Sequence, residues 1–173
     1  MIRIEYATMQ AALACRAANN DVRYYLKGIL IDTDGNVVST NGQIMFIGKV
    51  ADYAPSEQML FHVTLKPPAK YDHVMIDGNR ALFWVGEDFV DIRLEPIDGQ
   101  YPQWQRLVNS YKNGECKAFG LNGKYLRLIG KIAKPFGDCA LLEPAEDTIS
   151  LIRWTMKKSD EKAHVYLMPC RFG

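Results

Sequence analysis

Short turn sequences are the feature of this chain that most constrains its fold. Three of them contain Asp and Gly, residues that adopt tight turns readily, at positions 32–36 (DTDGN), 77–79 (DGN) and 86–88 (GED). The segments beside the last two, 80–85 and 89–94, are rich in β-branched and aromatic residues, which favour strands. Because turns this short join strands of opposite direction, the sequence predicts antiparallel β-sheet here.

Two segments have the composition of α-helices. Residues 6–18 are rich in good helix formers, with apolar residues four positions apart. Residues 122–134 begin with Asn122, a favourable helix cap, and are followed by Pro135 and Gly137, which end helices. Further strands are predicted at residues 23–32, 139–142, 148–154 and 164–170, and a loop packed against the core is predicted at residues 96–109. Together these elements predict an α+β fold, with two helices packed on antiparallel β-sheets.

Charge and cysteine content exclude several classes of protein. The chain carries 21 basic and 20 acidic side chains, a net charge of +1, so contact with DNA would need a local patch. Its 4 cysteines and 3 histidines are scattered without a Cys-x-x-Cys pair, so no metal, cofactor or disulfide framework is expected. Apolar runs are too short for a membrane span and no signal-peptide pattern is present. We therefore expect a cytoplasmic protein without a membrane partner.

Catalytic motifs are missing from the sequence. It contains no phosphate-binding loop, nucleophile elbow or zinc-protease helix. Its acidic clusters fall in predicted turns, where charged side chains are usually solvated. We expect no catalytic residues and no enzyme activity, with a hydrolase of unrecognised site as a further alternative.

Four stretches resemble the bacterial sliding clamp, the beta subunit of DNA polymerase III, in the same order. RYYLKGIL at 23–30 and STNG at 39–42 resemble the RYYLNG and TDGHRL motifs of the clamp's middle domain. IDGQYPQWQRL at 97–107 resembles the connector DGRFPDYRRV. LNGKYLRLIGKIA at 121–133 resembles the last-domain helix FNVSYLLDVLNAL, and YLMPCRF at 166–172 resembles the terminal YVVMPMRL.

The resemblance implies a truncated, clamp-like protein, and its size suggests a phage or prophage origin. Residues 1–99 would form a middle-domain-like half with a strand, a helix and antiparallel strands, and residues 100–109 a connector. Residues 110–173 would form half of a C-terminal domain with a helix and three strands. The clamp's first domain has no counterpart, and Pro67 and Pro68 stand where the middle domain's second helix would be.

In the clamp family these segments border a groove that binds short peptides of polymerases and repair proteins. The resemblance implies that role for Leu26, Thr40, Gly42, Met45, Pro102, Arg106, Leu107, Tyr166, Leu167, Met168, Pro169, Cys170 and Arg171. Leu, Met and Pro suit an apolar slot. The family's TDGHRL turn reads TNGQIM here, so we expect altered ligand preference. Packing in the core of the sheet is the alternative role of the apolar members.

Four cations recur three and four residues apart in the second predicted helix and so share one face. They are Lys124, Arg127, Lys131 and Lys134. The other face is apolar and is formed by Tyr125, Leu128, Ile129 and Ile132. The resemblance implies that this face contacts the phosphates of double-stranded DNA, independently of sequence and sensitively to salt. A merely solvated face is the alternative.

The leading hypothesis is a non-enzymatic, clamp-like module of DNA replication or repair that binds clamp-binding linear peptides. It would act either as a homo-oligomeric processivity factor or as a competitor of the host clamp, since exposed strand edges favour self-association. The alternative is a DNA-binding accessory protein that uses the basic second helix.

Overall fold

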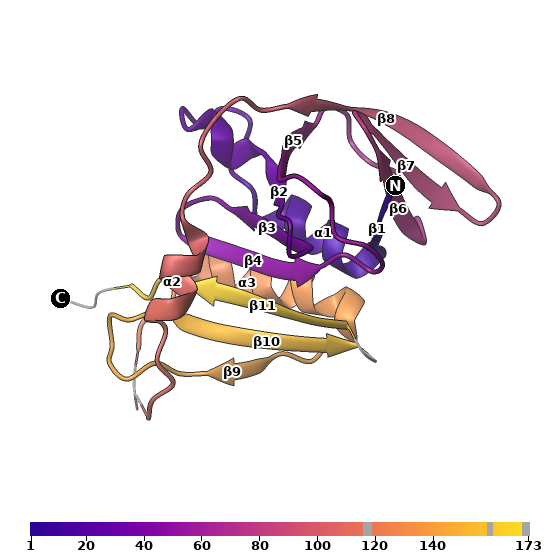
Figure 1. Cartoon of the computed structure of the whole chain (residues 1–173). Coiled ribbons are helices and arrows are strands. Elements are labelled where there is room, and N and C mark those ends of the chain that lie inside the picture. The colour runs from indigo at the N-terminus through magenta and orange to yellow at the C-terminus, as the bar shows by residue number, and fades with distance from the viewer. Residues whose placement is uncertain (116–118, 159–160, 171–173) are drawn as a thin grey trace.

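The described part of the chain is organised around one long antiparallel β-sheet. The computed structural model describes residues 1–115, 119–158 and 161–170. The strands are β1 (Ile2–Glu5), β2 (Ile29–Ile31), β3 (Asn36–Thr40), β4 (Ile44–Lys49), β5 (Met59–Val63), β6 (His73–Asp77), β7 (Arg80–Val85), β8 (Asp88–Pro96), β9 (Leu141–Glu143), β10 (Ile152–Lys158) and β11 (Glu161–Leu167). Their order across the sheet is β1-β6-β7-β8-β5-β2-β3-β4-β11-β10-β9 (Figure 1).

Two helices match the segments predicted from the sequence. They are α1 (Tyr6–Cys15) and α3 (Gly123–Ala133). The side chain of Asn122 caps α3, because it accepts a hydrogen bond from the N–H of Lys124 over 2.9 Å. The helix runs on into the 3-10 helix η2 (Lys134–Phe136), and Gly137 stops it in the left-handed conformation, with φ +103°. The predicted α+β class, with helices packed on antiparallel sheet, is confirmed.

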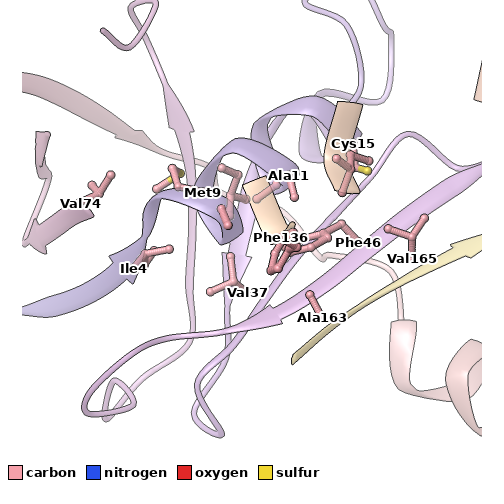
Figure 2. Packing of buried hydrophobic residues seen from close by; sticks show 14 of the residues in the cluster. Ile4, Met9, Ala11, Cys15, Val37, Phe46, Val74, Phe136, Ala163 and Val165 are labelled. Atoms are coloured by element: carbon pink, nitrogen blue, oxygen red, sulfur yellow. The ribbon is translucent and has the colours of Figure 1, made fainter. Parts of the chain in front are cut away.

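Helices α1 and α3 cover one face of the sheet and lie behind β3 and β4 in Figure 1. Side chains alternate along a strand, so every second residue of β4 points into this layer. Ile44 and Phe46 do so and are fully buried. Figure 2 shows Phe46 beside Phe136 of η2, with ring centroids 6.5 Å apart, in the same core as Met9 of α1. Segments far apart in sequence therefore share one core.

The opposite face of these strands carries a smaller apolar group, which we name the connector-side cluster. Its buried members are Ala17, Leu26, Leu30, Val38, Met45, Ile47, Tyr101, Trp104, Leu151 and Tyr166. Tyr101 and Trp104 belong to the segment that links the two halves of the chain, and both are buried. The connector is therefore packed against the sheet and is not a free linker.

Two pairings make the sheet continuous. The last strand, β11, pairs with β4, placing Tyr166 opposite Met45 and Leu167 opposite Ile44. Strand β8 pairs with β7 along most of its length and with β5 at its end, where Val63 lies opposite Leu94. The C-terminal part of the chain thus completes the sheet begun by the N-terminal part.

The structure differs from the sequence-based prediction in the type of two elements and in the position of two strands. Strands β10 and β11 cover residues 152–158 and 161–167, where 148–154 and 164–170 were predicted. Residues 23–32 were expected to form one strand, but they form the 3-10 helix η1 (Tyr24–Lys27) and then β2. The connector contains a seven-residue helix, α2 (Trp104–Ser110), where a loop was expected. Between β5 and β6 the chain around Pro67 and Pro68 is non-helical, as predicted.

No helix in the described ranges has the length and apolarity needed to cross a membrane.

Candidate functional site

The turn between β3 and β4 is held in a fixed shape by its own polar groups. The hydroxyl of Thr40 donates to the carbonyl of Ile44 over 2.8 Å and accepts from the N–H of Gly42 over 3.0 Å. Gly42 has φ +89°, a conformation that side chains disfavour. A Cβ there would also lie 2.5 Å from Nη1 of Arg23. Glycine is therefore favoured at this turn.

Arg23 is fixed over the same turn. Its guanidinium donates to both carboxylate oxygens of Asp21, over 3.0 and 2.8 Å, and to the carbonyl of Asn41 over 3.0 Å. The hydrogen bonds that Asp21 accepts from Arg23 lower the pKa of the Asp21 carboxyl to about 2. The turn thus carries a fixed Arg23–Asp21 ion pair at the surface, beside the segment that leads into η1.

The C-terminal tail lies against this turn. The N–H of Met168 donates to the carbonyl of Gln43 over 3.1 Å, and the N–H of Cys170 donates to the carbonyl of Gly120 over 2.8 Å. The Met168 side chain is 45% exposed, and Pro169 is half-buried. An accessible apolar side chain therefore lies directly beside the turn.

Beneath the turn and the tail lies the connector-side cluster. Leu26, Met45 and Tyr166 are each no more than 3% exposed. The connector packs on them through Tyr101 and Trp104, and α2 lies beside the ends of β4 and β11 (Figure 1). Turn, connector and tail therefore meet at the same end of strands β4 and β11.

The structure brings together most of the residues predicted to form the groove. Leu26, Met45 and Tyr166 share the buried cluster, and the connector contributes its exposed rim. The exposed connector residues are Pro102, Arg106 and Leu107. Leu167 is different, because it is fully buried in the layer beneath the helices. Arg171 lies outside the described residues.

The four cations predicted to contact DNA lie on a different surface. Lys124, Arg127 and Lys131 are exposed on α3, and Lys134 is exposed at the start of η2. The other side of α3 is buried in the helix-side core through Tyr125, Ile129, Ile132 and Ala133. The helix is amphipathic as predicted, with its cationic side free for solvent or a ligand.

No protein-family model matches the chain, and no curated protein matches it either. Solved structures do match. The sliding clamp of Pseudomonas aeruginosa is 15% identical with a TM-score of 0.63, and the match covers 98% of this chain and 66% of that one. The putative DNA polymerase III beta subunit of Eubacterium rectale is 14% identical with a TM-score of 0.59, covering 99% and 65%. The Helicobacter pylori beta clamp bound to a DNA ligase peptide is 15% identical with a TM-score of 0.62, covering 98% and 65%.

The chain has the fold of a bacterial sliding clamp. The clamp-like fold expected from the sequence is thereby confirmed. This clamp-fold chain spans 65–66% of the length of the three solved clamps.

One contact of the clamp-fold chain was missed by reasoning from sequence. The hydroxyl of Tyr125, in the first turn of α3, bonds to the side-chain oxygen of Gln43 in the β3–β4 turn. The two residues are 82 positions apart, and Tyr125 had been assigned only to the apolar side of its helix. No local pattern could have paired them, since the contact depends on the sheet joining the two halves.

A polar cluster on β9, β10 and β11 was also missed. Arg153 donates to Glu143 over 2.9 Å and lies 4.5 Å from the centre of the Tyr111 ring. Thr155 donates to the same carboxylate and contacts Nδ1 of His164 over 3.0 Å. The Arg153 hydrogen bonds lower the pKa of Glu143, whereas burial, followed by the Arg153 charge, lowers the pKa of His164. No group of three or more His, Cys, Asp or Glu in the described ranges could hold a metal ion.

Proposed function

We propose that this clamp-fold chain is a non-enzymatic module of DNA replication or repair that binds clamp-binding linear peptides. The observation that carries the proposal is the convergence of the β3–β4 turn, the connector and the tail around the connector-side cluster. Exposed apolar side chains beside a few fixed polar groups are the kind of surface that binds such peptides. The Helicobacter pylori clamp, which has the same fold, was solved with a DNA ligase peptide.

The chemistry of the surface defines the ligand. Met168 and Leu107 are exposed apolar side chains, 45% and 38% accessible, and Met adapts its shape to different partners. Arg106 adds positive charge, whereas the guanidinium of Arg23 is already paired with the Asp21 carboxylate. A short peptide with an apolar anchor and a neighbouring acidic residue suits this arrangement.

Fluorescence polarisation with a labelled clamp-binding peptide from a DNA ligase tests the proposal. The wild type should bind with a micromolar dissociation constant, about −8 kcal/mol. Met168→Glu should abolish binding, because it places a charge where the apolar anchor would lie. Leu141→Glu is the matched control, since Leu141 is 63% exposed on the distant strand β9. The proposal would be refuted if the wild type does not bind the peptide, or if Met168→Glu and Leu141→Glu lose the same amount of peptide affinity.

Within this function we propose a cytoplasmic protein that self-associates. The end strands β1 and β9 each have one neighbour in the described sheet, and open strand edges favour pairing with another chain. A ring-forming assembly would be a processivity factor, and a smaller one would compete with a full-length clamp for peptides. Light scattering at several concentrations, with and without duplex DNA, distinguishes the two.

A second candidate is a DNA-binding accessory protein, and the exposed cations of α3 and η2 favour it. Reversing the charge of Lys124, Arg127 and Lys131 should abolish duplex binding and leave peptide affinity nearly unchanged. If peptide binding is absent in the wild type while duplex binding is lost in this variant, the accessory role replaces the leading proposal.

A further inference from the structure

Gln43 lies where three separate segments of the chain meet. It belongs to the β3–β4 turn, where its own N–H donates to the side chain of Asn41 over 3.0 Å. Its side-chain oxygen bonds to the hydroxyl of Tyr125 on α3. Its carbonyl accepts the N–H of Met168 in the tail over 3.1 Å. One exposed residue therefore ties the turn to a helix on one side and to the tail on the other.

On the helix side, the connection begins at Lys124, one of the four exposed cations of α3 and η2. The ammonium of Lys124 lies 5.8 Å from the centre of the Tyr125 ring. The Tyr125 ring is 6% exposed and belongs to the helix-side core. Contacts therefore run without interruption from Lys124 through Tyr125 and Gln43 to Met168. They link the surface proposed for DNA with the surface proposed for peptides.

We propose that duplex DNA bound to α3 and a peptide bound beside Met168 strengthen each other, with Tyr125 and Gln43 as the positioning residues. The inference rests on the proposed function, because it presumes both ligands. Phosphates that immobilise Lys124 also immobilise the first turn of α3 and the Tyr125 hydroxyl. Gln43 and the tail are then fixed before the peptide arrives, so the peptide loses less conformational entropy on binding. Linkage requires that the peptide raise DNA affinity by the same factor.

Removal of one hydroxyl separates this coupling from the two binding events. Tyr125→Phe keeps the buried ring and loses the bond to Gln43. Tyr24→Phe is the matched control, since the Tyr24 hydroxyl donates to the carbonyl of Asp98 over 3.1 Å in an exposed contact. Gln43→Leu removes the same bond from the other side and should behave like Tyr125→Phe.

The experiment titrates the labelled DNA ligase peptide at low salt, with and without a saturating 20-base-pair duplex. In the wild type and in Tyr24→Phe the duplex should lower the peptide dissociation constant by about fivefold. In Tyr125→Phe and Gln43→Leu the duplex should leave it unchanged, while both ligands still bind. An unchanged constant in the wild type, or equal tightening in all four proteins, would overturn the proposal.

Amide hydrogen exchange gives a second readout that needs no peptide. Duplex should slow exchange at residues 41–45 and 165–170 in the wild type and not in Tyr125→Phe. If the peptide fails to bind but this protection appears, the proposed function is wrong, whereas the connection through Tyr125 and Gln43 is supported. If the peptide binds but protection is absent, the proposed function is supported and the coupling is refuted.

Discussion

Met45 of β4 lies directly opposite Tyr166 of β11, and both side chains are buried in the connector-side cluster. This pair sits where the last strand of the chain joins a sheet that begins more than a hundred residues earlier. Tyr111 from the connector side packs edge-on against Tyr166, with ring centroids 6.0 Å apart. The stability of the fold and the shape of the candidate groove therefore depend on the same few contacts.

Tyr166→Ala should destabilise the protein by about 3–5 kcal/mol, as expected for the loss of a buried aromatic side chain. Met168→Ala, two residues along at an exposed position, should change stability by no more than about 0.5 kcal/mol. Urea denaturation followed by tryptophan fluorescence measures both. Similar midpoints for the two variants would show that the β4–β11 junction contributes little to folding.

Two glycine substitutions should have opposite effects. Gly42→Ala should destabilise by about 1–2 kcal/mol, because the residue has φ +89° and its Cβ would press on Arg23. Gly130→Ala should stabilise by about 1 kcal/mol, since this position in α3 has open space around it and alanine favours helix. Thermal unfolding should move the two melting temperatures in opposite directions, and a common direction would contradict this account.

Salt should weaken binding of duplex DNA to α3. Each phosphate neutralised by a cation contributes about 0.9 to the slope of log affinity against log salt. Lys131→Glu should therefore lower that slope by about one. Lys157→Glu is the control, because Lys157 alternates with the buried residues of β10 and so points away from the helix layer. An equal effect of both changes would show that the field of the whole protein, and not the helix face, attracts DNA.

Acid should destabilise the fold through His164. Burial and the nearby Arg153 and Lys162 charges lower its pKa, so the unfolded chain takes up this proton more readily. Stability is therefore lost as pH falls from the unfolded value of about 6.5 through the lowered folded value. The lowered pKa of Glu143 acts in the same sense at still lower pH, where protonation removes its bonds to Arg153 and Thr155.

Urea midpoints at pH 7 and pH 5 test this assignment. His164→Asn should lose less stability between the two values than the wild type does, because it has no imidazole to protonate. If both proteins lose the same stability between pH 7 and pH 5, groups other than His164 cause the acid sensitivity.

Helix α3 was predicted well because its limits depend on residues next to it in the sequence. Asn122, Pro135 and Gly137 set the limits of α3 through capping and backbone geometry, and those limits were predicted closely. The strand predicted around Tyr24 and Leu26 was wrong, because a short aromatic and apolar run has no period that separates strand from 3-10 helix. There Leu26 reaches the connector-side cluster from a helical turn.

Long-range contacts could not be predicted from the sequence. Helix α2 has seven residues and no side-chain cap, so its formation depends on the burial of Trp104 rather than on intrinsic propensity. The Arg153–Glu143 pair and the Tyr125–Gln43 bond depend on strand register and helix placement. The resemblance to sliding clamps located the turn, the connector and the tail, but it did not indicate that Leu167 points into the opposite layer.

The alternation of side chains along β4 has one more consequence. Phe46 points toward the helices and Met45 toward the connector, so a single thickness of sheet separates two sides of the molecule. A duplex lying along α3 and a peptide lying beside the tail would occupy opposite sides of that partition. Neither would have to leave before the other arrived.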